Sequence, residues 1–252
     1  MPPTTQETDT ELWFPKLKSN RPARRRLFGF PFAGVGVTAF RGWADGLPPD
    51  VEFRPLLLPG RESRWREKPL ARMAEVIDQL WPLIQPLCDL PFAFYGHSLG
   101  GLMAFELTRR LRREGAPMPT RLFLSSRRPP HLPDRYPPIH ALPESAFIEA
   151  VQERYNGIPA VIRQDPDLMA LFLPTLRADF SLFETYAYVD EAPLDIPLSV
   201  FGGEQDPGVA RAELAEWERH TTAAFSLQMF SGDHFFLQSQ RAALLAAIAQ
   251  AL

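Results

Sequence analysis

Residues 92–107 read FAFYGHSLGGLMAFEL, and the rest of the chain is best interpreted from this segment. It begins with an apolar run at 92–95, typical of a buried strand, and enters a segment predicted to be helical from 99 to 114. Between them stands Gly96-His97-Ser98-Leu99-Gly100, a G-x-S-x-G sequence. A strand, a tight turn and a helix in this order form a nucleophile elbow, because the glycines lack the Cβ atoms that would collide there. We therefore expect the Ser98 hydroxyl at the carboxyl edge of a sheet.

Predicted strands and helices alternate on both sides of this segment. Apolar runs predict strands at 27–32, 51–58, 92–95, 121–126, 197–203 and 224–230. Helices are predicted at 38–47, 70–87, 99–114, 209–219 and 239–251. Such alternation builds a mostly parallel central sheet with helices on both faces, because the crossovers are right-handed. Together with the elbow, it predicts the α/β-hydrolase fold.

The alternation stops between about residue 127 and residue 190. This segment opens with the proline cluster RRPPHLPDRYPP at 127–138, which excludes a helix or a central strand. Further helices are predicted at 143–155, 166–173 and 174–187. We interpret the segment as a helical lid that is inserted into one domain.

Two parts are expected along the chain. Residues 1–23 are predicted to be a polar N-terminal arm, with Trp13 and Phe14 as docking points. Residues 24–252 are predicted to form a single α/β-hydrolase domain that includes the lid insertion at about 127–190.

The composition argues against several classes of protein. A net charge of -3 gives no electrostatic case for nucleic acid or an anionic membrane as partner. We find no apolar run of transmembrane length and no signal peptide, so a cytoplasmic protein is expected. The single cysteine, Cys88, allows no internal disulfide. No Cys/His cluster suggests a metal site, and we expect neither a metal nor a cofactor.

The serine hydroxyl needs a base that removes its proton before it can attack. In the predicted fold, this base comes from the loop between the last strand and the last helix. Of the five histidines, only His234 has this position, in the loop SGDHFF. We therefore predict that His234 is the base.

The third member of a triad is a carboxylate that orients the imidazole and follows a late strand. The loop GGEQDP offers Glu204 and Asp206. Asp206 is preferred, because it lies further from the strand and precedes Pro207, which fixes the turn. The predicted triad is therefore Ser98, His234 and Asp206, with Glu204 as the alternative acid.

Attack on an acyl carbonyl creates an oxyanion, which needs preformed hydrogen-bond donors. One predicted donor is the backbone N–H of Leu99, directly after the nucleophile. The other is expected from the turn FPFAGVG at 30–36, where Phe32 is the first choice and Ala33 the alternative. Together with the triad, these donors predict hydrolysis through an acyl-enzyme.

Five segments of the chain resemble the type II thioesterases that accompany nonribosomal peptide and polyketide synthases. They are FPFAGVG (30–36), LLLPGRESR (56–64), YGHSLGGLMAFELTRRL (95–111), FLPTLRADFSLFETY (172–186) and SGDHFFL (231–237). These segments follow the family's order and cover nearly the whole chain from about residue 13 onward. Val35 is a departure, because the family usually has a second consecutive glycine at that position.

The resemblance implies hydrolysis of acyl thioesters on the phosphopantetheine arm of a carrier protein, which clears stalled or wrong acyl groups from a synthase. It implies an acyl or peptidyl carrier protein domain as the partner. The family's triad carries over to Ser98, Asp206 and His234. We expect part of the lid to line an acyl pocket and a channel for the arm. Arg177 and Asp179 are expected to be structural and to form an ion pair.

Carrier proteins of this family's pathways are acidic, so a basic rim near the channel would help docking. The candidates for this rim are Arg61, Arg64, Arg66, Arg127 and Arg128. A free-standing esterase or lipase would use the same triad, and a non-catalytic carrier-binding protein would keep only the fold. We expect a monomer, because the sequence contains no heptad seam.

Overall fold

The central feature of the fold is a parallel sheet. The computed structural model describes residues 5–17 and 22–252. Within these residues, six strands pair in the order β2-β1-β3-β4-β5-β6, and every neighbouring pair is parallel. The strands are β1 (Arg25–Phe30), β2 (Val51–Pro55), β3 (Phe92–His97), β4 (Arg121–Ser125), β5 (Leu198–Gly203) and β6 (Phe225–Phe230). The predicted α/β class is therefore confirmed, with a sheet that is parallel throughout the described part of the chain.

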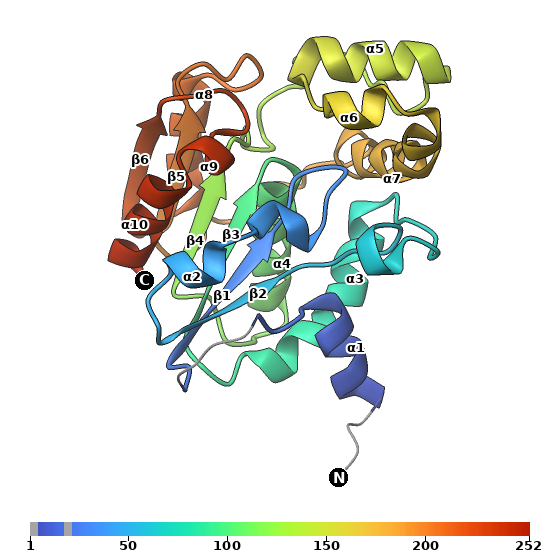
Figure 1. Ribbon diagram of the computed structural model, residues 1–252. Coiled ribbons are helices and arrows are strands. Elements are labelled where there is room, and N and C mark those ends of the chain that lie inside the picture. Colours follow the sequence, from blue (N-terminus) through green and yellow to red (C-terminus); the bar gives the residue numbers. More distant parts are fainter. Residues whose placement is uncertain (1–4, 18–21) are drawn as a thin grey trace.

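Helices cover both faces of this sheet (Figure 1). They are α1 (Thr5–Trp13), α2 (Trp43–Gly46), α3 (Met73–Ile84), α4 (Leu99–Arg113), α5 (Glu144–Tyr155), α6 (Ala160–Arg163), α7 (Pro166–Glu184), α8 (Arg211–Ala215), α9 (Phe236–Ser239) and α10 (Arg241–Ala251). Short 3₁₀ turns lie at Val37–Phe40, Glu62–Arg64, Gln85–Leu87 and Glu216–His220. Helices α1, α3 and α4 lie on one face, and α2, α9 and α10 lie on the other.

The inner strands β1, β3 and β4 are mostly apolar on both sides because both faces of the sheet are covered. Along β1, Phe28 and Phe30 point into the core beneath α3 and α4, whereas Leu27 points into the core beneath α2 and α10. This alternation follows from the pleat of a strand, whose successive side chains leave opposite faces. Strands with apolar residues on both faces can be buried at the centre of the domain. Because β1 and β3 lie there, their carboxyl ends are held in place by the surrounding core.

The lid lies between β4 and β5 in the chain and consists of α5, α6 and α7 (Figure 1). The two helices predicted at 166–173 and 174–187 are one helix, α7, with Pro174 inside it. An interior proline costs about 3 kcal/mol, but the buried stripe of α7 runs across it from Leu173 to Phe180. The lid has a core cluster of its own, formed by Ile139, Phe147, Val151, Ile158, Leu173, Leu176 and Phe180.

The segment predicted as an N-terminal arm packs into the domain where the structure describes it. Helix α1 ends at Trp13, and the ring of the next residue, Phe14, is fully buried against Phe28 and Phe30. Leu57 N donates a hydrogen bond to Trp13 O at 2.8 Å. Two buried aromatic rings release enough apolar surface from water to hold a short helix in place. The rest of the predicted arm includes residues 1–4 and 18–21, which lie outside the described residues.

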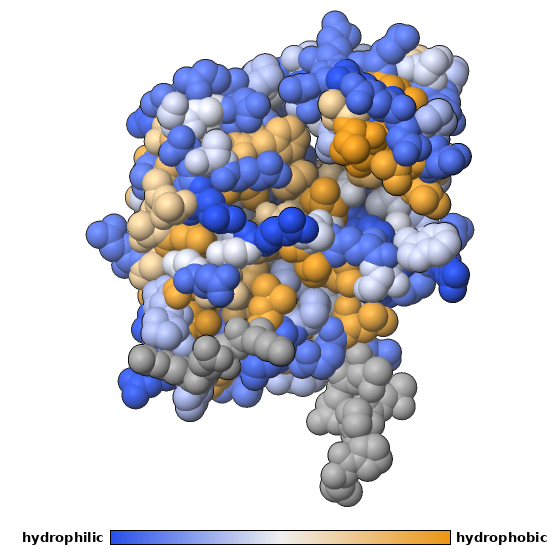
Figure 2. All heavy atoms as spheres, viewed as in Figure 1, coloured by the Kyte–Doolittle hydropathy of each residue, from blue (hydrophilic) through white to orange (hydrophobic). Residues whose placement is uncertain are grey.

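Apolar surface gathers over α6 and α7 in the space-filling view (Figure 2). Val161, Leu168 and Leu171 are the exposed large apolar side chains of these two helices. A search for long apolar helices among the described residues finds none that could cross a membrane.

Candidate active site

Ser98 stands at a strained turn between β3 and α4. Its backbone has φ 54° and ψ -115°, and its N–H donates to Ser125 O at 2.7 Å. A Cβ added at Gly96 would lie 2.2 Å from Gly100 O, and one added at Gly100 would lie 2.0 Å from Phe30 O. No side chain fits at such distances, so both glycines of the G-x-S-x-G sequence are required by close backbone approach.

His234 and Asp206 meet through a short hydrogen bond. His234 lies between β6 and α9, Asp206 follows β5, and His234 Nδ1 lies 2.7 Å from Asp206 Oδ2. The Asp206 side chain is 1% exposed and also accepts from Gly208 N at 2.9 Å. The alternative acid, Glu204, is exposed and forms no hydrogen bond with His234 among the described residues. Of the two candidate acids, the structure therefore places Asp206 against the imidazole.

The carboxylate of Asp206 is held in its charged form. Burial alone would raise its pKa, but the His234 ring and the N–H of Gly208 donate to the carboxylate, and their combined effect lowers the pKa below its usual value. A carboxylate can only accept, so His234 Nδ1 carries the proton of this bond. The other ring nitrogen, Nε2, is then free to take a proton.

His97, inside the elbow, supports the loop of His234. Its side chain is fully buried, and its Nε2 lies 2.8 Å from His234 O while its Nδ1 lies 2.9 Å from Ser125 Oγ. Burial and the nearby His234 charge lower the pKa of His97 to about 3, so its ring is neutral. Since a carbonyl oxygen only accepts, Nε2 is the protonated nitrogen. The G-x-S-x-G pattern leaves position 97 unspecified, so the sequence did not predict that His97 supports the loop of His234.

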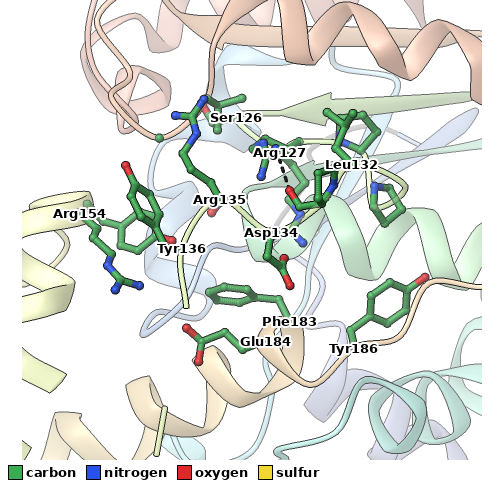
Figure 3. Close-up of a pocket in the computed structure, with 18 of the residues that line it drawn as sticks. Ser126, Arg127, Leu132, Asp134, Arg135, Tyr136, Arg154, Phe183, Glu184 and Tyr186 are labelled. Atoms are coloured by element: carbon green, nitrogen blue, oxygen red, sulfur yellow. Dashed lines mark hydrogen bonds between the residues drawn. The ribbon is translucent and has the colours of Figure 1, made fainter. Parts of the chain in front are cut away.

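Two cavities of different character open at Ser98 and His234. The smaller, about 40 Å³, is apolar and lies under the lid; its lining is Phe32, Ala33, Ser98, Val151, Tyr155, Gly157, Leu176, Phe180, Phe183, His234 and Phe235. The larger, about 440 Å³, has a more polar, mixed lining and lies beside the proline-rich loop at 127–138 (Figure 3). It shares Ser98, Tyr155, Phe183 and His234 with the smaller cavity. Part of the lid therefore lines a pocket at Ser98, as expected, while most of its apolar residues pack within the lid.

Two of the three candidate oxyanion donors belong to residues that line the smaller cavity. Phe32 and Ala33 both line it, and neither backbone nitrogen donates to another backbone or side-chain group within the described residues. Leu99 is the first residue of α4, and the first N–H groups of a helix have no partner inside the helix. Phe32 and Ala33 thus share a cavity with Ser98, and Leu99 follows Ser98 directly in the chain.

The turn after β1 is held by a buried carboxylate on lid helix α7. Asp179 is fully buried and accepts from Gly34 N at 2.7 Å. It also forms a two-pronged ion pair with Arg61, with both N–O distances at 2.8 Å. The expected pair of Arg177 with Asp179 is wrong: Arg177 instead donates to the carbonyl oxygens of His140 and Leu142 at 2.5 and 2.7 Å. Two residues apart on a helix, the side chains of 177 and 179 leave different faces.

A second carboxylate, that of Glu62 in the loop after β2, accepts hydrogen bonds from the same turn. Glu62 accepts from the backbone nitrogens of Gly36, Val37 and Thr38 at 3.0 to 3.2 Å, and from Thr38 Oγ1 at 2.6 Å. A carboxylate can accept several hydrogen bonds, so one side chain satisfies three consecutive N–H groups. Neither this contact nor that of Asp179 was predicted from the sequence.

The predicted basic rim is wrong for two of its five members. Arg61 and Arg64 are each 5% exposed, and their guanidinium groups pair internally with Asp179 and Glu67. Arg66 is exposed, and Arg128 pairs with Glu213 at 2.9 Å. The fifth member, Arg127, lines the larger cavity.

A parallel sheet with a strained serine at the end of β3, a late-loop histidine held by a buried carboxylate and an inserted lid defines the α/β-hydrolase class. Comparison with known proteins narrows this class. A model of the thioesterase domain matches residues 25–252, so the chain belongs to the thioesterase family and is a hydrolase that acts on thioesters.

Similar proteins come from biosynthetic pathways. The gramicidin S biosynthesis protein GrsT of Aneurinibacillus migulanus is 40% identical over 91% of this chain and 89% of its own length. The solved type II thioesterase BorB from the borrelidin biosynthetic cluster has 30% identity, a TM-score of 0.83 and 96% coverage of both chains. YbtT, a type II thioesterase from the yersiniabactin NRPS/PKS pathway, has 28% identity and a TM-score of 0.82, with 93% of this chain and 95% of its own covered. The resemblance to type II thioesterases of such pathways is confirmed.

Proposed function

We propose that this enzyme removes acyl groups from the phosphopantetheine arm of carrier proteins in a nonribosomal peptide or polyketide synthase, with Ser98, His234 and Asp206 as its triad. The single observation that carries the catalytic assignment is the Asp206–His234 bond of 2.7 Å beside cavities that Ser98 also lines. The thioesterase family model and the relatives from synthase pathways support the substrate class.

The chemistry follows from the proton positions. His234 Nε2 takes the proton of Ser98 Oγ as the oxygen attacks the thioester carbonyl. Backbone N–H groups of Leu99 and of Phe32, with Ala33 as the alternative, stabilise the oxyanion. The carbon–sulfur bond then breaks, and the leaving thiolate takes the proton from His234. A water molecule gives its proton to the same nitrogen and attacks the acyl-serine, which releases the acid and restores the Ser98 hydroxyl.

The test is hydrolysis of one acyl group presented in three ways: on a phosphopantetheinylated carrier protein, as a pantetheine thioester and as an oxygen ester. Ser98→Ala is the blank. We expect the carrier-bound form to have the highest kcat/KM and the blank to lose all of it. Equal or faster turnover of the oxygen ester would identify a general esterase instead, and carrier binding without turnover would identify a binding protein.

The acid assignment has a matched pair of variants. Asp206→Asn should lower kcat by about 10⁴-fold, because the imidazole loses the carboxylate that fixes its tautomer and stabilises its charge. Glu204→Gln lies in the same loop and should leave kcat within twofold. The reverse order of effects would assign the acid to Glu204.

A further inference from the structure

Arg127 lines the larger cavity (Figure 3), which Ser98 also lines. It follows Ser126 at the end of β4, and a Cβ added at Gly101 would lie 3.1 Å from Arg127 Cβ. The stem of the side chain therefore packs on the first turn of α4, the helix that Ser98 precedes. Its guanidinium lies 5.3 Å from the centre of the Phe183 ring, which lines both cavities.

The guanidinium of the half-buried Arg127 lacks the partners that more deeply buried arginines have. In the described part of the chain it donates no hydrogen bond and pairs with no carboxylate, and its Nε is buried without a partner. Arg61 and Arg109, in contrast, pair with Asp179 and with Glu106. Arg127 is half-buried with its Nε away from water, and a guanidinium that loses part of its hydration without a counter-charge is suited to bind an anion.

Neither carboxylate that lines the same cavity forms an ion pair with Arg127. Glu184 already accepts from the backbone nitrogens of Ile139 and His140 and lies 2.7 Å from His140 Nδ1. Asp134 is exposed on the proline-rich loop and forms no ion pair with Arg127, although its charge partly opposes the effect of burial on the pKa of Arg127. Burial accordingly lowers the pKa of Arg127, which an anion brought by a ligand would counteract.

We infer that Arg127 binds an anionic oxygen group of the thioester substrate, and so acts as a specificity-determining residue; this inference rests on the proposed thioesterase function. A carboxylate or a phosphate matches the planar fork of a guanidinium, and its charge would complete the pair that the protein leaves open. The neighbouring Arg128 cannot play this part, because Glu213 already neutralises it.

A substrate of this enzyme has two sources of such a group. One is a carboxylate at the far end of a short acyl chain, close to the carbonyl that Ser98 attacks. The other is the phosphate of the phosphopantetheine arm, at the opposite end of the arm from the thioester. Both present the same chemistry to Arg127, and synthetic thioesters separate them.

The experiment compares three small substrates: butyryl-pantetheine, succinyl-pantetheine and butyryl-phosphopantetheine. The first carries no anion, the second adds a carboxylate to a chain of equal carbon count, and the third adds the phosphate. Each is assayed with the wild type, Arg127→Gln and the control Arg128→Gln. Charge-assisted hydrogen bonds are strong enough that we expect kcat/KM of Arg127→Gln to fall about 10- to 100-fold on an anionic substrate and to stay within twofold on butyryl-pantetheine.

The outcomes separate cleanly. A loss confined to succinyl-pantetheine assigns the site to an acyl carboxylate, and one confined to butyryl-phosphopantetheine assigns it to the arm. An equal change on all three substrates, or the same pattern in Arg128→Gln, overturns the inference. If Arg127→Gln fails to fold, the wild type decides: competitive inhibition of butyryl-pantetheine hydrolysis by free succinate or inorganic phosphate at low salt supports the site, and no inhibition overturns it. Failure of the wild type on butyryl groups, free and carrier-bound, would instead refute the proposed function.

Discussion

Two turns face each other at the candidate site, and they are held in opposite ways. The turn at Ser98 is fixed by its own glycines, whose neighbours approach so closely that no Cβ fits. The turn after β1 is fixed from outside, by Asp179 of the lid and by Glu62 of the loop after β2. The first turn therefore depends on steric contacts between residues close in sequence. The second depends on charged side chains that are distant in sequence, so the two turns should respond differently to mutation and to pH.

The largest effect is expected at the elbow itself. In Gly100→Ala the new methyl group would lie 2.0 Å from Phe30 O, a backbone atom of the central strand β1 that cannot move aside. We expect no folded, active protein, measured as soluble yield and circular dichroism. The control is Gly115→Ala, at φ 63° with no atom of the described residues within 4 Å of the added Cβ, which should cost only about 1 kcal/mol of unfolding free energy. A folded, active Gly100→Ala enzyme would refute the steric account.

Next in size is the buried pair that holds the opposite turn. Asp179→Leu leaves the Arg61 guanidinium buried without a partner, which should lower the unfolding free energy by about 3–5 kcal/mol. In the double variant Arg61→Met with Asp179→Leu, stability should return while kcat stays low, because Gly34 N still lacks its acceptor. Urea unfolding and steady-state kinetics on the same samples test both parts. Recovery of kcat along with stability would show that Asp179 does not position the turn.

A smaller effect is expected from the second carboxylate. Glu62→Gln keeps one acceptor oxygen but loses the charge that holds three N–H groups, so kcat should fall about 10-fold with little loss of stability. Glu67→Gln, a few residues along the same loop and paired with Arg64, is the matched control and should keep full kcat. Equal kcat in both variants would mean that Glu62 is dispensable for the turn.

The smallest effect is expected from His97, a neutral side chain within the elbow, in contrast to the charged Asp179 and Glu62 that hold the opposite turn. The pKa of His97 is about 3 in the folded protein and 6.5 as a free side chain, so below pH 6.5 the unfolded chain binds the extra proton and stability falls as the pH falls. Between pH 7 and pH 5.5 this linkage costs the wild type about 1 kcal/mol. His97→Gln should lack that part of the pH dependence. Unfolding free energies of both proteins at the two pH values give the difference, and identical pH dependence would contradict it.

The same contrast explains how much the sequence could predict. The elbow is local, so its glycines and their place between a strand and a helix are visible within a few residues. Asp206 and His234 were predicted to meet because each follows a late strand, and parallel strands end at one edge of the sheet. The ion pair of Arg61 with Asp179 could not be predicted in this way. Arg61 and Asp179 are 118 residues apart, and only the folded lid brings them together. Arg61 was therefore assigned to a surface where it does not lie.

Burial was harder to predict than element type. The alternation of strands and helices followed from apolar runs, yet the aromatic end of the first helix was assigned to an arm because its preceding residues are polar. Separate helices were predicted at 166–173 and 174–187, whereas the apolar stripe of α7 continues across Pro174. In both cases packing against distant residues outweighs the local preference.

The contact of Asp179 with Gly34 has a consequence for protein engineering. A lid exchanged between related enzymes to alter the accepted acyl length would bring a new residue 179 into a scaffold that supplies residue 61 and the turn at 34. The lid should therefore be exchanged together with residue 61 and the turn at 34, although these positions lie far from the lid in the sequence. Chimeras that mismatch this set should fold with the new pocket and turn over slowly, and restoring the matched arginine and carboxylate should recover their rates.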